Sequence, residues 1–406
     1  MAAIPRTRPW SGPALLSYGF RPFFLLAGIQ GVLVMLAWTA FLAGTLPLPR
    51  AFPPAAWHAH ELLFGYGFAV VAGFLLTAIP NWTGRLPLNG LPLLALVGLW
   101  LLGRLAVFAA DLLPPAVLAL ATLLFPATLT FVAGREVVAG DNRRNLPVVG
   151  LVGALGLAQA VLHLELALGG DARLAPRLAT ALLLLLILLI GGRIVPSFTT
   201  NWLRHHRPGT ALPTPFDRFD RLAIALGALG LLPWVAAALT QPPAGAGLLA
   251  VLAGLVHLVR LWRWRPLSTG GEPLLAVLHL AYLFVPLGFL AAGVGLFLDL
   301  PGLALAATHV WTVGAIGLMT LAVMTRATRG HTGRRLTAPP DTVAIFAFVV
   351  VAAALRVTAA LLPEAGTSLL PAAGLAWIAA FAAFLIAYGP MLCGPRACSS
   401  RQSRRV

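Results

Sequence analysis

The stretch LAPRLATALLLLLILLIGGRIVP, residues 174–196, decides the fold of this chain. It has the length and composition of a membrane-crossing helix, which needs about 20 predominantly apolar residues. Soluble domains carry about a quarter charged residues, whereas this chain of 406 residues is 59% hydrophobic and only 10% charged. The stretch and its surroundings therefore predict a polytopic membrane protein.

Twelve apolar stretches follow one another along the chain, separated mostly by Pro, Gly or charged residues. They run near residues 22–44, 58–80, 91–110, 113–133, 147–168, 174–196, 221–240, 245–263, 274–298, 302–325, 341–362 and 368–392. No soluble domain lies between them. The sequence predicts an all-α fold, a polytopic transmembrane helical bundle of about twelve spans, which forms a single integral membrane domain over residues 1–406.

The arginines fall almost wholly on alternate loops. All 28 basic residues are arginine. With each arginine near the end of a stretch counted in the adjoining loop, 23 lie on one set of loops and chain ends and three lie on the other set. Arg104 and Arg356 lie well inside predicted helices. Cytoplasmic loops are the ones rich in basic residues, so both termini are expected in the cytoplasm. The net charge of +16 is spread over these short loops, which argues against a nucleic-acid-binding surface.

The two ends of the chain add little to this expectation. The first apolar run is too long for the h-region of a signal peptide. Residues 393–406 are expected to form a disordered basic tail. Its cysteines, Cys393 and Cys398, are expected to be unpaired thiols, with a metal site as the alternative.

A weak repeat recurs every four predicted helices. The ends of the second, sixth and tenth helices read Pro80-Asn81-Trp82-Thr83-Gly84-Arg85-Leu86, Pro196-Ser197-Phe198-Thr199-Thr200-Asn201-Trp202 and Gly330-His331-Thr332-Gly333-Arg334-Arg335-Leu336. This recurrence predicts three arcs of four helices. The alternative is that threonine, glycine and arginine are simply common at helix ends.

Ionisable side chains gather near one face of the predicted bundle. Ionisable groups inside a bilayer are costly and usually functional. The outer set comprises His58, His60, Glu61, Arg104, His163, Glu165, His309 and Arg356. A looser inner set comprises His257 and His279 inside helices, with His205, His206 and His331 on loops. The outer set is the strongest functional signal in the sequence.

The outer histidines predict a metal site, because imidazole suits copper, iron and zinc. His58 and His60 lie about 160° apart on a helix, so either they serve two sites or His58 belongs to the preceding loop. The joint placement of both with His309 favours metal binding over hydrogen-bonded core histidines. Below His58 the same face carries Gly65, Ala69 and Ala72; such small residues permit close helix packing or the approach of a flat macrocycle.

The two arginines inside predicted helices suit a cofactor that carries carboxylates. Arginine pairs well with carboxylates, and Arg104 and Arg356 lie at a depth that suits the propionates of a haem. The alternative for Arg104 is a salt bridge with Glu61 or Glu165. These alternatives stay open at the level of sequence.

Long motifs along the chain closely resemble the NnrS family. They are Ser17-Tyr18-Gly19-Phe20-Arg21-Pro22-Phe23-Phe24, Trp57-His58-Ala59-His60-Glu61 with Phe64-Gly65-Tyr66, Ala78-Ile79-Pro80-Asn81-Trp82-Thr83-Gly84, Arg193-Ile194-Val195-Pro196-Ser197-Phe198-Thr199, His279-Leu280-Ala281-Tyr282, and His309 with Gly314-Ala315-Ile316-Gly317, Met324-Thr325-Arg326 and Gly330-His331-Thr332-Gly333-Arg334. The resemblance spans nearly the whole chain.

The resemblance implies a twelve-span protein of the bacterial inner membrane that binds haem and copper. It also implies a part in the nitric oxide response, with production during denitrification and relief of nitrosative stress. It implies no settled reaction, so whether the protein is an enzyme stays open. The recurring histidines of the family fall on His58, His60, His279, His309 and His331; the family motifs do not carry His163, His205, His206 or His257.

We therefore expect an outer haem or copper centre that uses His58, His60 and His309. His279 and His331 would serve a second centre or stabilise the inner ends of helices. The bilayer and a small ligand, nitric oxide, are the expected partners, and the oligomeric state stays open. Two other functions compete with this one: a secondary transporter, which in-membrane ionisable groups also suit, and an assembly factor without a cofactor.

Overall fold

The computed structural model describes residues 10–243 and 245–397, and within them the chain is helical and has no strand. The principal helices are α1 (Phe20–Leu42), α2 (Pro54–Ala59), η2 (His60–Tyr66), α3 (Gly67–Thr83), α4 (Gly90–Phe108), α5 (Pro115–Ala139), α6 (Leu146–Ala167), α7 (Leu174–Leu186), η5 (Ile187–Gly191), α8 (Gly192–His206), α9 (Arg218–Ala236), α10 (Ala246–Trp262), α11 (Pro273–Phe297), α12 (Pro301–His309), η7 (Val310–Gly317), α13 (Leu318–His331), α14 (Pro340–Leu361) and α15 (Gly366–Cys393). The all-α prediction is confirmed.

Short 3₁₀ turns occur between several of these helices. They are η1 (Ala14–Leu16), η3 (Ala110–Leu112), η4 (Arg143–Asn145), η6 (Pro266–Thr269) and η8 (Pro363–Ala365). Each occupies a connection between long helices or the approach to α1, where the sequence places proline, glycine or charged residues.

In the described part of the chain, eleven continuous helices are long and apolar enough to cross a membrane. The remaining predicted span, the eighth along the chain, corresponds to α10, which has 17 residues. Such a helix is about 26 Å long, at the lower limit for crossing the hydrocarbon core. Many large apolar side chains point outward, among them Phe108 at 85% exposed and Leu91 at 79% exposed. Lipid is the solvent that suits such surfaces, so the chain is a multi-pass membrane protein.

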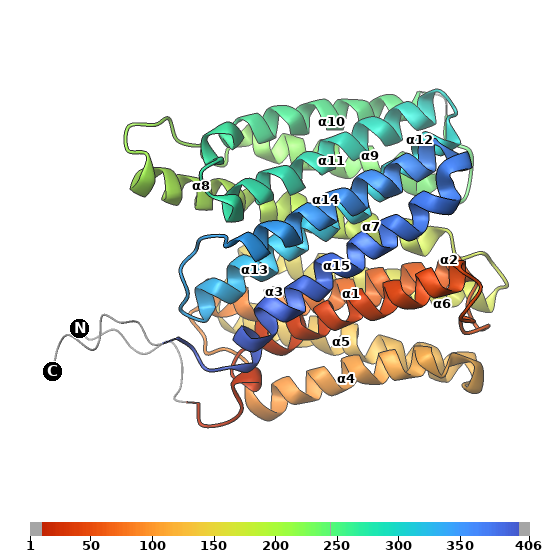
Figure 1. Ribbon diagram of the computed structural model, residues 1–406, viewed down its shortest axis with the longest axis horizontal. Helices are drawn as coiled ribbons and strands as arrows, with labels where there is room; N and C mark the ends of the chain where they lie inside the picture. The colour runs from red at the N-terminus through yellow and green to blue at the C-terminus, as the bar shows by residue number, and fades with distance from the viewer. Residues whose placement is uncertain (1–9, 244, 398–406) are drawn as a thin grey trace. The chain divides into compact units, whose positions relative to one another are not determined.

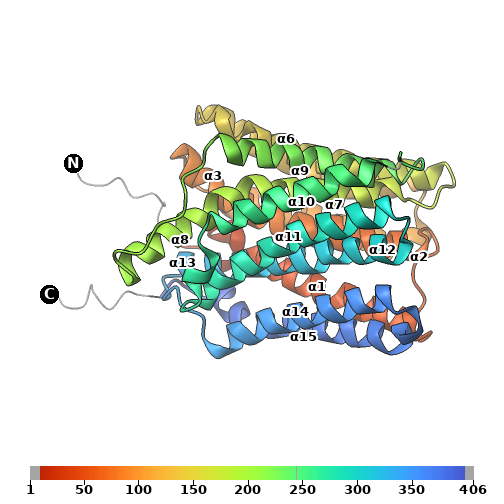
Figure 2. The ribbon, with the colours of Figure 1, turned by 90° about the horizontal axis from the view of Figure 1, so that it is seen from above.

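The helices form two compact units. Unit 1 consists of residues 1–171, 323–336 and 381–406, and unit 2 consists of residues 172–322 and 337–380. In unit 1, α1 packs against α3, and α5 lies between α4 and α6. In unit 2, α10 lies next to both α9 and α11, as Figure 1 and Figure 2 show. The single membrane domain and the three arcs of four helices stay predictions.

Three of the spanning helices contain a π-helical segment. These segments are η2, which joins α2 to α3, η5, which joins α7 to α8, and η7, which joins α12 to α13. They interrupt the second, sixth and tenth predicted helices, the same three whose ends show the sequence repeat. Because π-helical turns are rare and concentrate at functional sites, the polar side chains around these three segments are candidates for function.

The second and tenth helices share a longer pattern than their ends alone. His60 precedes Gly84 by 24 residues, and His309 precedes Gly333 by the same 24. η2 begins at His60, and η7 begins directly after His309. Both glycines have a positive φ, +71° and +78°, which glycine adopts without steric cost at a helix end. The repeat therefore extends from the terminal glycine back to a histidine.

Two helices extend beyond the ends that the apolar pattern predicts. α8 continues to His206 and α13 to His331. The prediction that His205, His206 and His331 lie on loops is therefore wrong: all three are helical, and all three are exposed. An apolar run marks only the part of a helix that lies in lipid, and a helix can continue past the bilayer surface on polar residues.

Arg21 joins the beginning of α1 to the end of α15 within unit 1. One nitrogen, Nη1, donates to the carbonyl oxygens of Met391 at 3.3 Å, Leu392 at 2.8 Å and Gly394 at 2.6 Å. The last carbonyl groups of a helix have no partner within the helix, so Arg21 satisfies groups that would otherwise stay unpaired. The side chain is only 4% exposed. The beginning of α1 and the end of α15 thus lie at the same end of unit 1, as an even number of spans requires.

The loop contacts within unit 1 agree with the alternation of the arginine-rich loops. At the arginine-rich end, Arg85 Nε donates to Glu136 Oε2 at 2.5 Å, which joins the ends of α3 and α5. On the other set of loops, the Ala51 amide donates to Asp111 Oδ1 at 2.8 Å. Cys393 ends α15 and is exposed, and residues 394–397 of the predicted tail are described as well. Residues 398–406, with Cys398, lie outside the described residues.

We predict that Arg21→Lys lowers the stability of the detergent-purified protein by about 1.5–3 kcal/mol, the usual net value of a hydrogen bond that involves a charged group. Lysine keeps the positive charge, but its side chain is shorter than that of arginine, so its ammonium does not reach the place that Nη1 occupies among the three carbonyl groups. Thermal unfolding followed by fluorescence measures the loss. Arg204→Lys, at an exposed position of α8, is the control and is expected to change nothing. Equal stability of the two variants would contradict the capping role of Arg21.

Candidate functional site

A buried carboxylate, Glu61, is the centre of the polar cluster in unit 1. Gln30 Nε2 donates to Glu61 Oε2 at 2.7 Å, and His60 Nδ1 donates to Oε1 at 2.8 Å. Arg104 Nη1 also donates to Oε1 and forms an ion pair with it. Glu61 is 5% exposed and His60 is fully buried. The salt bridge of Arg104 with Glu61, one of the alternatives from the sequence, is therefore confirmed.

The π-helical segment η2 makes room for this cluster. Its Gly65 carbonyl accepts a hydrogen bond from Trp100 Nε1 of α4 at 3.0 Å, so a carbonyl group in an irregular turn is satisfied from outside the helix. A Cβ atom at Gly65 would lie 2.7 Å from Arg104 Nη1 and 2.9 Å from Gln30 Nε2. A side chain here would displace the Arg104 and Gln30 groups that donate to Glu61, so Gly65 leaves room for this cluster.

The hydrogen bonds define the protonation of His60. Because a carboxylate only accepts, the Nδ1 atom that contacts Glu61 carries the proton. Its Nε2 atom lies 3.2 Å from Gln159 Nε2, an amide nitrogen that only donates. A second positive charge next to Arg104 would be unfavourable in this buried place. His60 is thus a neutral imidazole that presents the electron pair of Nε2 toward α6.

His58 and His60 have different surroundings. His58 lies in α2, not in the preceding loop, and its ring centroid is 4.3 Å from that of Trp38 in α1. The ring of His60 instead contacts Phe52, Phe64 and His163. The structure therefore has the arrangement that the helical geometry predicted, in which the two histidines do not share one site.

His309 lies in unit 2 at the start of the π-helical segment η7. Its Nδ1 donates to the Leu305 carbonyl oxygen at 3.0 Å, so the electron pair of the imidazole lies on Nε2. Two residues later, the fully buried Trp311 donates to the Val285 carbonyl oxygen at 3.0 Å. Trp311 thereby fixes the beginning of η7 against α11.

His279 has one nitrogen engaged and one unused. Thr199 Oγ1 donates its only hydrogen to the Val195 carbonyl oxygen at 2.9 Å, so it accepts from His279 Nε2, which lies at 2.9 Å. Nδ1 then carries the electron pair. It is buried and has no hydrogen-bond partner among the described residues, and the residue is 3% exposed. A buried imidazole nitrogen of this kind is suited to a metal ligand.

A second buried cluster, which the sequence did not predict, lies around η5 in unit 2. Arg260 donates from Nε to Asp220 Oδ1 at 2.9 Å, and from Nη1 to the Leu188 carbonyl oxygen at 2.9 Å and the Tyr282 hydroxyl at 3.0 Å. His257 Nδ1 lies 2.9 Å from the same hydroxyl. Arg260 was predicted on a loop, because the helix was expected to end where its apolar residues end, whereas α10 continues to Trp262. A charge directly after an apolar run, one turn from a histidine, was the available signal.

Hydrogen-bond directions in this second cluster are also defined. An arginine only donates, so the Tyr282 hydroxyl accepts from Arg260 and donates its proton to His257 Nδ1. Asp220 belongs to the capping box of α9, in which Asp217 is the first residue. The hydrogen bond from Arg263 lowers the pKa of Asp217. The cluster therefore joins a helix N-terminus to a buried tyrosine–histidine pair.

The remaining predicted site residues are dispersed. His331 lies against Tyr18 and Phe20, with ring centroids 5.6 Å and 5.4 Å away. Arg356, on α14, is half-buried, as is Glu165 near the end of α6. Exposed His206 stacks on Trp202, with ring centroids 5.1 Å apart. His205 is exposed as well. Nothing in the described chain gathers three or more His, Cys, Asp or Glu side chains that could hold a metal ion.

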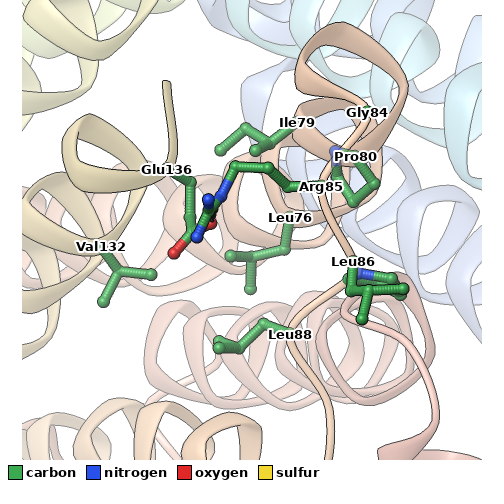
Figure 3. A pocket seen from close by; sticks show the side chains of 10 residues that line it. Leu76, Ile79, Pro80, Gly84, Arg85, Leu86, Leu88, Val132 and Glu136 are labelled. Atoms are coloured by element: carbon green, nitrogen blue, oxygen red, sulfur yellow. Dashed lines mark hydrogen bonds and ion pairs between the residues drawn. The ribbon is translucent and has the colours of Figure 1, made fainter. Parts of the chain in front are cut away.

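A cavity of about 420 Å³ lies at the arginine-rich end of unit 1. Figure 3 shows Arg85 extended toward Glu136, near the apolar side chains of Leu76 and Val132. The other lining residues are Ile79, Pro80, Gly84, Leu86, Pro87 and Leu88. The lining contains no histidine, so this cavity is separate from the buried polar clusters.

A family model described as NnrS protein matches residues 14–396. The chain belongs to the NnrS family. No curated protein matches it. The match covers both compact units of this NnrS protein, including all five histidines that the family motifs carry. Of these, His58, His60 and His331 lie in unit 1, whereas His279 and His309 lie in unit 2.

We predict that Glu61→Gln destabilises the protein by about 3–5 kcal/mol, because it leaves the charge of Arg104 unpaired in an apolar place. The double variant Glu61→Gln/Arg104→Met removes both charges and is expected to regain a large part of that loss. Thermal unfolding of Glu61→Gln, of Arg104→Met and of the double variant gives the coupling energy between the two side chains directly. Strictly additive effects would show that the ion pair does not hold α4 to η2.

Proposed function

We propose that this NnrS protein binds haem and copper in the bacterial inner membrane and takes part in the nitric oxide response. The observation that carries the proposal is His60, a fully buried imidazole whose Nδ1 proton is held by a carboxylate. This is the arrangement that orients a histidine as a metal ligand, because it fixes the tautomer and leaves Nε2 to bind.

The other motif histidines fit metal binding to different degrees. His309 donates Nδ1–H to a backbone carbonyl, the other common way to orient a ligating imidazole. His279 Nδ1 is buried without a partner among the described residues. His58 and His331 lie against aromatic rings. We propose His58, His60 and His331 as metal ligands in unit 1, with His58 and His60 in separate places, and His279 and His309 as ligands of two separate centres in unit 2.

The charged residues would act around these ligands. Glu61 holds the His60 ring in place and increases the basicity of its free nitrogen, while Arg104 balances the charge of Glu61. Arg356, half-buried on α14, is proposed as a partner for the propionates of a haem. Arg104 is less available for such a role, since Glu61 already accepts from it.

Nitric oxide is the ligand that this setting suits. It is small and apolar, so it can reach an intramembrane site through lipid without an aqueous channel. Bound haem iron or copper would supply the affinity for nitric oxide. The protein itself contributes dry, apolar surroundings within each unit: Phe52 in unit 1 and Trp311 in unit 2 are almost fully buried. Electrons for any net turnover would come from an external donor.

The transporter is the competing function. In-membrane charges and interrupted helices also occur in transporters. However, the described charges around η2 and η5 are paired within the protein and do not surround the one cavity described above. The π-helical segments recur every fourth helix, whereas transporter repeats are usually related by inversion or by halves of the chain. The metal-binding proposal explains the imidazole nitrogens more directly.

An absorption spectrum of the purified protein, with and without nitric oxide, tests the proposal together with iron and copper analysis. We expect a Soret band that shifts when nitric oxide is added. His60→Ala is expected to lose metal from unit 1, and His309→Ala and His279→Ala are each expected to lose metal from their own centre in unit 2. His205→Ala, at an exposed position, is the control and is expected to retain both metals.

Two outcomes would overturn parts of this proposal. A purified wild-type protein without haem absorption or copper would exclude metal binding and favour the transporter or an assembly factor. If His279→Ala folds normally but loses the same cofactor as His309→Ala, the assignment of these two histidines to separate centres is wrong.

A further inference from the structure

Two imidazole rings lie close together at the low-arginine end of unit 1. The ring centroids of His60, on η2, and His163, on α6, are 5.7 Å apart, and the rings are inclined by 72°. Phe52 contacts both rings, with centroid distances of 5.4 Å and 6.4 Å. Phe52 is 2% exposed, so the rings meet beneath an apolar cover. The NnrS motifs do not carry His163.

The hydrogen bonds leave one nitrogen of each ring with an electron pair. His60 donates Nδ1–H to Glu61, as described above, and keeps the electron pair on Nε2. Thr122 Oγ1 donates to the Ala119 carbonyl oxygen at 3.0 Å, so it accepts from His163 Nε2 at 2.8 Å. The electron pair of His163 is therefore on Nδ1. Both rings are thus oriented by an outer hydrogen bond, which is the usual state of a ligating histidine.

The separation of the rings fits a shared ion. An imidazole nitrogen binds a metal at about 2.0 Å, and the ring centre lies roughly 1.2 Å behind it. Two imidazoles on one ion then have centroids about 5–6.4 Å apart, depending on the angle between them. The observed 5.7 Å lies within this range. No large movement of either helix is needed to bring both rings onto one ion.

Gln159 supplies an independent indication of a ligand. It lies one helical turn before His163 on α6 and is 1% exposed. Its Oε1 is buried and has no hydrogen-bond partner among the described residues. Its Nε2 lies 3.2 Å from His60 Nε2 and 3.4 Å from the Thr122 carbonyl oxygen. An unsatisfied buried carbonyl oxygen is costly. An ion on His60 Nε2 would replace the hydrogen bond from Gln159 Nε2, and the amide, once turned, would direct Oε1 toward the ion.

The donor set favours one kind of ion. Zinc in proteins takes four ligands, and copper(II) prefers four in a plane, whereas this place offers two imidazoles and one amide. Copper(I) is satisfied with two or three ligands and binds imidazole. Its single charge also costs less to bury than a double charge, because the desolvation energy grows with the square of the charge.

We propose that His60 and His163 bind one copper(I) ion between η2 and α6, with the Gln159 side chain beside it. This inference deepens the proposed function and rests on it for the presence of copper. It adds His163 as a ligand and Thr122 as the group that sets the orientation of that ligand.

Copper(I) titration of the copper-free, haem-containing full-length protein in detergent tests the proposal. A chromogenic copper(I) chelator serves as competitor, and X-ray absorption counts the nitrogen ligands. We expect His163→Phe to weaken one copper(I) site by about 100-fold or more, since loss of even an outer partner costs 10–100-fold. Thr122→Val is expected to weaken it by about 10-fold. Both variants are expected to keep the Soret band, which reports folding and the haem centre.

The matched control is His205→Phe, the same substitution at an exposed position, and it is expected to leave copper(I) affinity unchanged. If wild-type protein binds copper(I) but His163→Phe binds it with equal affinity, the His60–His163 site is wrong while the proposed function stands. If wild-type protein binds haem but no copper(I), the copper part of the proposed function fails and this site fails with it. A ligand count without two imidazole nitrogens would also overturn the site.

Discussion

The charge of Glu61 is the constraint on which the described site depends. A carboxylate that is 5% exposed in a membrane-spanning helix must be compensated locally. Gln30, Arg104 and His60 supply that compensation from α1, α4 and η2. The same interactions set the tautomer of His60 and hold three helices together. Stability and metal-binding chemistry in unit 1 thus rest on one group of hydrogen bonds.

The π-helical segments recur in every fourth predicted helix. At η2 and η5 a side chain from another helix donates to a carbonyl oxygen of the segment, Trp100 to Gly65 and Arg260 to Leu188. At η7 the direction is reversed, because Trp311 of the segment donates to the Val285 carbonyl oxygen of α11. An interrupted helix in lipid needs such partners, because no water is present to satisfy its backbone. The clusters around η2 and η5 each combine an arginine, a carboxylate and a histidine. They differ in one respect, since Tyr282 stands between Arg260 and His257.

The sequence was sufficient for the fold and for a part of the site. Apolar length and the arginine pattern located all twelve helices, because both follow from the thickness and the asymmetry of a bilayer. The same pattern placed His205 and His331 on loops, since it cannot follow a helix beyond lipid. The Arg104–Glu61 pair was among the predicted alternatives. The proximity of His163 to His60 was not, because neither hydropathy nor spacing determines which faces of two distant helices meet.

The guanidinium of Arg21 also has a consequence for biosynthesis. Its acceptors at Leu392 and Gly394 lie 371 and 373 residues further along the chain. At ribosomal speeds of about 5–20 residues per second, Arg21 waits roughly 20–75 s before they exist. Until then it stays hydrated among the lipid headgroups, and α1 lacks its final anchor. A chain that lacks the last span therefore leaves this guanidinium without its three carbonyl acceptors.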